Sequence, residues 1–405
     1  MRNIYSCIDI GSDSVKLVVC ELYKGRYNLL AATSTKSKGI KKGLIYDVNE
    51  VTNSIKQALK EIEAMLGFEI KKVLAIIPSH FADFIKIEAK IDTEDEIYSD
   101  DIVKVLQEAI RNGIIPTKEM LTAIPIDFTV EQGTVKDPTG MHSNFLETRA
   151  ILVTVPKKNI ESVTSILKDI GIEVVDIFLG CIGDIYAYKT HEMDNQIGAI
   201  INIGAEVTSV SLYNKGIIVK NNLISMGSKN IDNDISYMYG VSAIDAKNLK
   251  ETFALAHKNG ASTSETREII NKNNETLKIN QFEISEIIMS RIEEILALAK
   301  TEITSLTNKQ LDYIIITGGI TNLPNLNQVV RDIFGNCAII GDINLVGLRN
   351  NKYSSAIGSI IYFVNKLKLK GTEYSMVTTE EMEVSSIKSN DDNVLGKVFG
   401  YFFGE

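Results

Sequence analysis

The sequence has no excess of basic residues, which limits its partners. Lys and Arg number 43 against 52 Asp and Glu, giving a formal net charge of −9. A broad electrostatic surface for DNA or RNA is therefore not expected. The hydrophobic share of 44% and the charged share of 23% are typical of a globular protein, and 405 residues suffice for two to four domains.

Cysteine and histidine are scarce. The four cysteines form no C-x-x-C pair and lie in apolar, strand-like segments, so we predict core packing in a reducing cytoplasm (Cys7, Cys20, Cys181 and Cys337). The four histidines show no ligand spacing. A metal site built from protein ligands alone is not expected.

Long hydrophobic runs are also absent. No apolar stretch approaches the roughly 20 residues that a membrane-spanning helix needs. The first residues, MRNIY, lack the apolar core of a secretion signal. The richest run, 357–364, is interpreted as part of a buried helix.

The first third of the chain combines two patterns. Short β-rich segments separated by turns predict a strand meander, and apolar residues at helical spacing then predict a helix before a further buried strand (strands 4–10, 15–22, 27–32 and 72–77; helix 48–66). The next block predicts a compact α+β insertion with one solvated sheet face (strands 85–91, 121–130 and 149–155; helix 102–111), followed by a helix over 158–170.

The second half repeats the opening pattern of strand, Gly turn and strand from residue 199 onward. The polar stretch 258–280 is predicted to contain a mobile loop. The remaining patterns predict a strand over 313–316, helices over 231–239, 284–304, 326–334 and 354–367, and a charge-rich linker over 371–392.

The two Gly turns can bind phosphate. The first is CIDIGSDSVKLVV, with Asp9 before Gly11, and the second is IINIGAEVTSVSL, with Asn202 before Gly204. Such turns present backbone N–H groups, and an acid beside them can hold a Mg²⁺-bound water. One such turn is weak evidence, because β-hairpins commonly contain Gly.

Duplication strengthens the phosphate-binding interpretation. Each turn begins a similar β-rich unit, and a third Gly turn, TGG, follows the apolar strand 313–316. There, a Gly pair lets a flat nucleoside lie against the backbone. This order is typical of an actin-type fold, in which two related domains close over a nucleotide.

At these motifs the sequence resembles the FtsA family of bacterial cell-division proteins, within the actin superfamily. The likeness spans essentially the whole chain. It includes DIGSDSVK, IPIDFTVEQGTVKDPTGM, IDNDISYMYG, DAKNLK, IIITGGITNLPNL and YSSAIGSIIY. The resemblance implies an α/β, actin-like (ribonuclease H-like) fold of two duplicated domains with a nucleotide cleft, an FtsA-type α+β inserted subdomain and a C-terminal amphipathic helix on a flexible linker.

The resemblance also implies domain boundaries. They are 1–83 and 165–194 for domain 1A, 84–164 for inserted subdomain 1C, 195–230 and 308–370 for domain 2A, 231–307 for subdomain 2B, 371–392 for the linker and 393–405 for the membrane-targeting helix.

Family roles can be transferred to matching positions. Asp9 would hold Mg²⁺ through water, and Lys16 would bind phosphate, with a solvated strand lysine as the alternative. Gly11 and Ser12 would contact phosphate oxygens. The other residues that the resemblance implies for the ATP site are Asp13, Asn202, Gly204, Ala205, Lys250, Thr317, Gly318 and Gly319.

The second turn departs from the family pattern D-x-G-G-G-(T/S). Asn202 lacks the charge that orders a Mg²⁺-bound water, Ala205 and Glu206 restrict the backbone, and Glu206 brings a like charge toward the phosphates. Val207 replaces a hydroxyl, and Lys247 stands where many relatives carry a ribose-binding Glu. We therefore predict ATP binding with weak or no hydrolysis, the alternative being that Asn202 substitutes well enough.

The last residues, NVLGKVFGYFFGE, form an apolar arc at 100° per residue. This pattern predicts an amphipathic helix lying in a membrane interface. The predicted membrane residues are Val394, Leu395, Val398, Phe399, Tyr401, Phe402 and Phe403. Lys397 is the one basic residue there, so attraction to anionic lipid should be weak. Packing of this tail on the core or on a partner is the alternative.

The resemblance also implies a partner site. FtsA holds the C-terminal peptide of FtsZ on its outer subdomain, and Arg291 and Glu294 in SRIEEIL match positions that the family uses there. A solvated i,i+3 ion pair is the alternative.

Together these features predict an adaptor at the cytoplasmic face of the membrane, at the division site. It would tie FtsZ filaments to that membrane, help assemble the divisome and polymerise, without binding nucleic acid. An active ATPase of the superfamily and an adaptor like the pilus-assembly protein PilM are the alternatives. A sugar kinase is disfavoured because no substrate-binding acid or base constellation is visible.

Overall fold

The structure is a computed structural model that describes residues 2–113, 117–343, 345 and 347–377. The predicted amphipathic helix over 393–405 lies outside these residues, as does most of the predicted linker.

The first sheet has the strand order β11-β6-β1-β2-β3. Strands β1, β2 and β3 form the predicted antiparallel meander. Strand β6 lies parallel to β1, and β11 lies parallel to β6. The strands are β1 (Asn3–Ile10), β2 (Ser14–Tyr23), β3 (Arg26–Lys36), β6 (Lys72–Ile77) and β11 (Glu173–Leu179), and a short hairpin joins β4 (Ile40–Lys41) and β5 (Leu44–Ile45).

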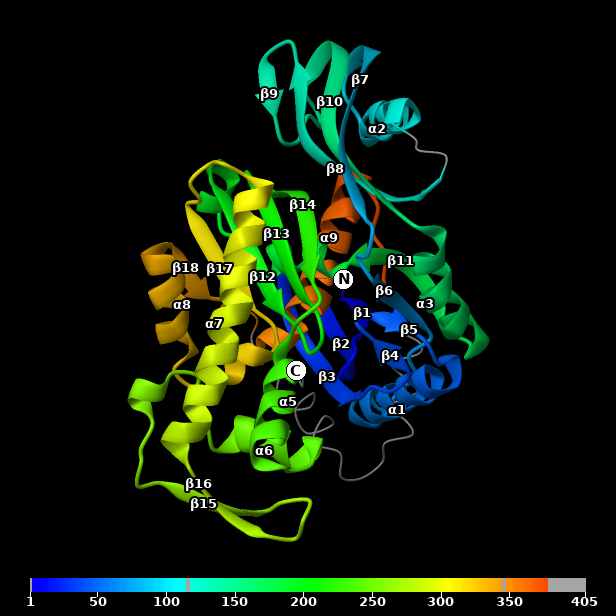
Figure 1. The fold of residues 1–405 in the computed structure, drawn as a ribbon. Helices are drawn as coiled ribbons and strands as arrows, with labels where there is room; N and C mark the ends of the chain where they lie inside the picture. The colour runs from blue at the N-terminus through cyan, green and yellow to red at the C-terminus, as the bar shows by residue number, and fades with distance from the viewer. Residues whose placement is uncertain (1, 114–116, 344, 346, 378–405) are drawn as a thin grey trace, which may run out of the picture.

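The second large sheet repeats this topology, with the order β14-β13-β12-β17-β18. An antiparallel meander of three strands is again followed by two strands added in parallel. Its strands are β12 (Ile197–Ile203), β13 (Thr208–Asn214), β14 (Ile217–Ile224), β17 (Tyr313–Thr317) and β18 (Ala338–Ile340). The predicted duplication is therefore confirmed, and Figure 1 shows the two sheets side by side.

The insertion forms a separate sheet with the order β7-β10-β8-β9, which extends away from the two large sheets in Figure 1. Its elements are β7 (Asp83–Glu96), α2 (Ser99–Gly113), β8 (Glu119–Val130), β9 (Gly133–Val135) and β10 (His142–Val155). Ile102 and Val105 of α2 pack on Phe128 and Leu146 of the sheet, while residues along β7 alternate in exposure. The predicted α+β insertion with a solvated sheet face is confirmed.

Helix α1 (Val48–Leu66) shows how the sequence sets element boundaries. The Asp47 side chain caps it by accepting from the Glu50 N–H group at 3.1 Å, and Gly67 ends it at a φ of 79°. Its buried face includes Val51 and Ile55, at helical spacing. The predicted range 48–66 is confirmed.

The other helices are α3 (Lys157–Asp169), α4 (Gly180–Tyr188), α5 (Ser228–Tyr239), α6 (Ala243–Thr252), α7 (Gln281–Leu306), α8 (Leu326–Phe334) and α9 (Ser354–Leu369). Short 3₁₀ turns are η1 (Glu192–Asn195), η2 (Lys258–Gly260), η3 (Gly319–Asn322), η4 (Gly335–Cys337) and η5 (Asn351–Tyr353). Sequence patterns did not predict α4, α6 or β11.

Two segments differ from their predictions. Within the polar stretch 258–280, predicted to contain a mobile loop, residues 266–280 form a hairpin of β15 (Thr266–Ile270) and β16 (Thr276–Asn280), because cross-strand pairing satisfies a backbone that has little apolar cover. The predicted linker over 371–392 is wrong at its start. There the Met376 N–H group donates to the Ile4 carbonyl at 2.9 Å, and the Met376 and Val377 side chains are buried.

Helices α4 and α9 cross between the two large sheets in direct backbone contact. A Cβ atom at Gly358 would overlap the Gly183 carbonyl oxygen, and one at Gly183 would overlap the Ser355 carbonyl oxygen. Because glycine alone permits this approach, the crossing fixes how the two halves meet.

Gly358→Ala should therefore lower the free energy of unfolding by about 3 kcal/mol, because one helix must move off the other. Gly67→Ala is the control: its Cβ would meet nothing within 4 Å, although its φ of 79° makes a cost of about 1 kcal/mol expected. Urea denaturation measures both, and equal losses would contradict the close crossing.

Candidate nucleotide site

The first Gly turn carries an ion pair at its base. Asp9 lies directly opposite Lys16 in the β1–β2 pair, and Lys16 Nζ lies 2.8 Å from Asp9 Oδ2. The two side chains are only 18% and 16% exposed. Lys16 is therefore not a solvated strand lysine, and it faces the acid that was predicted beside the phosphates.

The turn itself is tight. The Gly11 N–H group donates to the Ser14 carbonyl at 3.1 Å, and a Cβ at Gly11 would lie 3.4 Å from Lys16 Nζ. The Ser12 hydroxyl accepts from the Gly43 N–H group at 2.8 Å. Asp13, at the tip, is bound by Lys247 of α6 at 2.8 Å.

Burial acts to raise the pKa of Asp13, but the hydrogen bond from Lys247 and the charges of Lys247, Lys250 and Lys16 outweigh it and hold the pKa below its ordinary value. Asp13 therefore stays charged in mild acid.

The second Gly turn begins at Asn202, at the end of β12 and beside Thr317 of β17. The Asn202 amide nitrogen donates to Asp184 Oδ2 at 2.8 Å and lies 3.4 Å from Ser355 Oγ. The Gly204 N–H group closes the turn by donating to the Val207 carbonyl at 3.0 Å.

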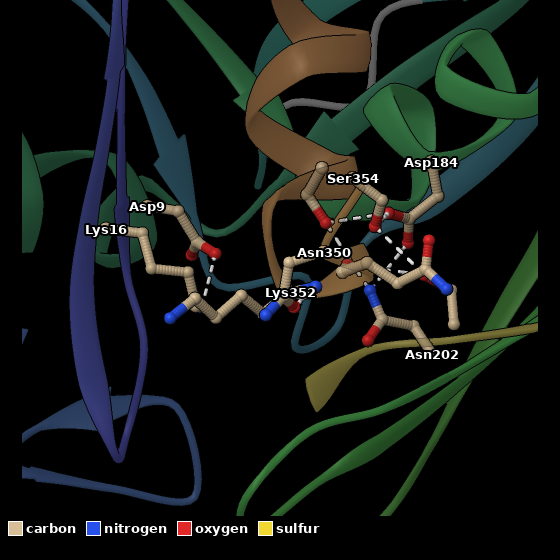
Figure 2. A network of polar contacts seen from close by, with 10 residues as sticks. Asp9, Lys16, Asp184, Asn202, Asn350, Lys352 and Ser354 are labelled. Atoms are coloured by element: carbon tan, nitrogen blue, oxygen red, sulfur yellow. Dashed lines mark hydrogen bonds and ion pairs between the residues drawn. The ribbon is translucent and has the colours of Figure 1, made fainter. Parts of the chain in front are cut away.

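Asp184 is a site residue that the sequence analysis missed. It lies on α4 with 2% of its surface exposed, and its Oδ1 accepts from the hydroxyls of Ser354 at 2.8 Å and Ser355 at 2.7 Å. Burial raises its pKa, against the hydrogen bonds from Asn202, Ser355 and Ser354. A single acid inside the apolar stretch GCIGDIYAY was the available signal. Figure 2 shows Asp184 facing Asn202 and Ser354.

The third Gly turn adjoins the second. Thr317 is buried, and its hydroxyl is hydrogen-bonded to the Tyr188 hydroxyl at 2.5 Å. Gly318 has a φ of 98°, and a Cβ there would overlap the Ile203 carbonyl and lie 2.8 Å from Asn202 Oδ1. A Cβ at Gly319 would meet nothing within 4 Å. The ends of β12 and β17 therefore meet at this point.

Lys250 lies beside the second turn: its ammonium donates to the Ser228 carbonyl at 3.4 Å, and the Ser228 N–H group donates to the Gly204 carbonyl at 2.9 Å. The Lys250 side chain is 6% exposed and its ammonium lies 2.6 Å from Asp232 Oδ1 on α5. Burial raises the pKa of Asp232, against the charge and hydrogen bond of Lys250. This pairing accounts for both buried charges.

Glu206 is oriented differently from the sequence-based expectation. It forms an ion pair with Lys229 at 2.7 Å and accepts from the Lys42 N–H group at 2.5 Å. Its charge is therefore compensated rather than unpaired beside the phosphates. Ala205 serves as an acceptor, because its carbonyl binds the Lys229 N–H group at the start of α5 at 2.8 Å.

Two of the contacts that cross between the domains use Lys247 and Glu206, side chains that depart from the family pattern. Lys247 connects α6 to Asp13 on the first turn, and Glu206 connects the second turn to Lys42 in the β4–β5 hairpin. Side chains of this protein thus connect each Gly turn to the opposite domain.

Lys352, on η5, is a further cation that the sequence analysis missed. In Figure 2 it lies between the Asp9–Lys16 pair and the Asn202 network. Burial lowers its pKa, as do the charges of Lys16 and Lys247, against those of Glu251 and Asp13. Lysines therefore gather where the sequence predicted phosphates.

A second candidate site is a groove of about 360 Å³ between α5 and α7. The predicted Arg291–Glu294 ion pair is present, but Arg291 also binds Asp234 through two nitrogens at 2.6 and 2.9 Å. Tyr237 and Met238 beside them are 88% and 63% exposed. The groove is lined by Asp234, Tyr237, Met238, Glu286, Ile287, Ser290, Arg291 and Glu294.

Two other features are absent from the described part of the chain. No three or more His, Cys, Asp or Glu side chains are grouped so that they could hold a metal ion. No helix within those residues is long and apolar enough to cross a membrane.

The duplicated sheets, the crossing helices and the facing Gly turns define a protein with an actin-like fold. The PilM–PilN type IV pilus biogenesis complex shares it at a TM-score of 0.59 and 13% identity, with 89% of this chain and 98% of that chain covered. MreB5 of Spiroplasma citri bound to ADP shares it at a TM-score of 0.56 and 14% identity, with coverage of 91% and 98%. Identities this low show the fold alone.

Sequence comparison identifies the family. The model described as cell division protein FtsA matches residues 199–358, and that of the SHS2 domain inserted in FtsA matches 84–154. FtsA of Bacillus subtilis is 26% identical over 387 residues, covering 94% of this chain and 88% of the relative. FtsA of Streptococcus pneumoniae is 28% identical over 376 residues, covering 90% and 81%. The chain belongs to the FtsA family of cell-division proteins, as its motifs predicted.

The Lys247–Asp13 ion pair should hold α6 against the first Gly turn. Lys247→Glu would place a carboxylate opposite Asp13, and like charges should drive α6 away from the first turn. Spin labels at residues 56 on α1 and 248 on α6, in a Cys337→Ser background, should report a longer mean distance by pulsed electron resonance without nucleotide.

Lys309→Glu, the same charge change on an exposed loop, is the matched control and should leave the distance unchanged. The wild-type distance should persist at pH 5, because the lowered pKa of Asp13 keeps the pair charged until the pH falls through that lower value. An unaltered distance in Lys247→Glu would mean that the Lys247–Asp13 pair does not hold α6 against the first Gly turn.

Proposed function

We propose that the chain attaches FtsZ filaments to the cytoplasmic face of the membrane at the division site, helps assemble the divisome and polymerises. It binds ATP with Mg²⁺ and hydrolyses it weakly or not at all. The convergence of three Gly turns and their charged residues in an FtsA-family chain carries this proposal.

The first turn has the chemistry for phosphate and magnesium. Lys16 offers an ammonium beside the turn, and Asp9 offers a carboxylate that is partly exposed. An ion shared with the phosphates would be held by Asp9 through water. Mg²⁺ would neutralise charge on the phosphate oxygens. The two MreB5 structures, bound to ADP and AMPPNP, support a nucleotide as occupant.

Weak hydrolysis follows from the second turn. An Asn at position 202 carries no charge, and its amide nitrogen is already bound to Asp184. Orientation of an attacking water loses strength without a carboxylate at position 202.

Binding of ATP is tested by titrating the full chain with ATP in Mg²⁺ and in EDTA. Lys16→Met should weaken binding roughly 10–100-fold, because a charge-assisted hydrogen bond is lost. Lys24→Met, in the turn that follows the same strand, should not. Removal of Mg²⁺ should weaken binding, and little phosphate should be released. Steady release would contradict weak hydrolysis.

The groove on α5 and α7 fits a short peptide such as the FtsZ C-terminus. Tyr237 and Met238 offer exposed apolar surface, and Arg291, held in place by Asp234, can donate a hydrogen bond to a carboxylate of the peptide. Exposed aromatic and Arg side chains are the residue types that most often dominate binding energy.

A flotation assay with liposomes and FtsZ separates membrane attachment from FtsZ capture. Wild-type chain should float and carry FtsZ with it. Deletion of residues 393–405 should abolish flotation of both proteins, because the apolar arc is lost. Tyr237→Ser with Arg291→Glu should float without FtsZ.

The matched control is Tyr98→Ser with Arg111→Glu, which makes the same changes on the inserted subdomain and should carry FtsZ normally. FtsZ carried equally by the groove variant would contradict the docking site. Flotation of the truncated chain would contradict the membrane role of the tail.

A further inference from the structure

The acid that the family pattern places at the second turn lies elsewhere in this chain. Position 202 is Asn, and a buried carboxylate, Asp184, lies 2.8 Å from its amide nitrogen. The carboxylate is on α4 rather than on the strand (Figure 2).

The two oxygens of Asp184 have separate roles. Oδ1 accepts from Ser354 and Ser355, and Oδ2 accepts from Asn202. A carboxylate can only accept, so it requires the nitrogen of the Asn202 amide to face it. The Asn202 oxygen is then held on the side of Gly318, the adjoining turn.

A charged acceptor also strengthens the amide as an acceptor. Hydrogen bonds to an ionised group polarise the donor, and the effect is larger where water is excluded. Asp184 is only 2% exposed, so its charge acts on Asn202 with little screening. The Asn202 oxygen suits a water or hydroxyl donor of a bound nucleotide complex.

We propose that Asp184 is the positioning residue of the second phosphate turn. It fixes the orientation of the Asn202 oxygen toward the ligand, and it supplies the negative charge of this turn from helix α4. This inference rests on the proposed nucleotide site. It also links that site to the domain crossing, because Ser354 and Ser355 begin α9.

The swap of the two side chains is chemically matched. In Asp184→Asn with Asn202→Asp, the new Asn oxygen can still accept from both serines while its nitrogen donates to the new carboxylate. In Asn202→Asp alone, a half-buried carboxylate at position 202 faces the buried carboxylate of Asp184. In Asp184→Asn alone, the Asn202 amide should turn over and present its nitrogen to Gly318.

The test measures the melting temperature and the affinity for ATP with Mg²⁺ in all four proteins. Asn202→Asp should lower the melting temperature by roughly 5–10 °C. Asp184→Asn should fold but bind ATP about 10-fold more weakly. The swapped protein should regain the wild-type melting temperature within about 3 °C and bind ATP at least as tightly as the wild type, because its carboxylate lies at the strand end.

Asn221→Asp is the matched control, since its amide contacts the hydroxyls of Ser209, Ser211 and Ser79 rather than an acid, and it should cost less than Asn202→Asp. Additive losses in the swapped protein, or unchanged ATP affinity in Asp184→Asn, would overturn the positioning role. A wild-type chain that binds no nucleotide would overturn the proposed function, and with it the role of Asp184 toward the ligand.

Discussion

The glycine-mediated crossing of α4 and α9 is the contact on which the geometry of the cleft depends. Helix α4 leads from the first sheet into β12, and α9 returns from the second domain to pack on β1 and β2. Because their backbones touch at Gly183 and Gly358, the strand ends of both sheets are held at one place. Asp184 and the two serines of the network are carried on these same helices, so the domain junction and the site are one structure.

A buried carboxylate at such a junction is tolerated only when it is fully hydrogen-bonded. Asp184 meets that condition through two hydroxyls and one amide. The network continues from Ser354 to Thr317 at 3.1 Å and from Thr317 to Tyr188. Its members come from helices and strands of both halves, so a change at the second turn acts directly on the groups that join them.

The residues that depart from the family pattern are explained by the side chains and backbone groups that they bind. Asn202, Glu206 and Lys247 look like losses when each is compared with the family residue. In the structure each has a specific partner: Asp184 for Asn202, Lys229 and Lys42 for Glu206, and Asp13 for Lys247. The residues that depart from the family pattern therefore form specific bonds of their own, and the bonds to Asp184, Lys42 and Asp13 reach the N-terminal half of the chain.

The sequence by itself determined the periodic elements and the two Gly turns. Helix α1 and the meanders were predictable because caps, turn residues and apolar spacing are local signals. The Asp9–Lys16 contact also follows from two-residue alternation across a tight turn. The short helix α4 and the hairpin over 266–280 were not predictable, because tertiary packing and cross-strand pairing stabilise them. Only the tertiary structure decided that Asp184 meets Asn202 and that Lys247 meets Asp13, because hydrogen bonds between residues distant in sequence depend on where the domains bring their backbones together.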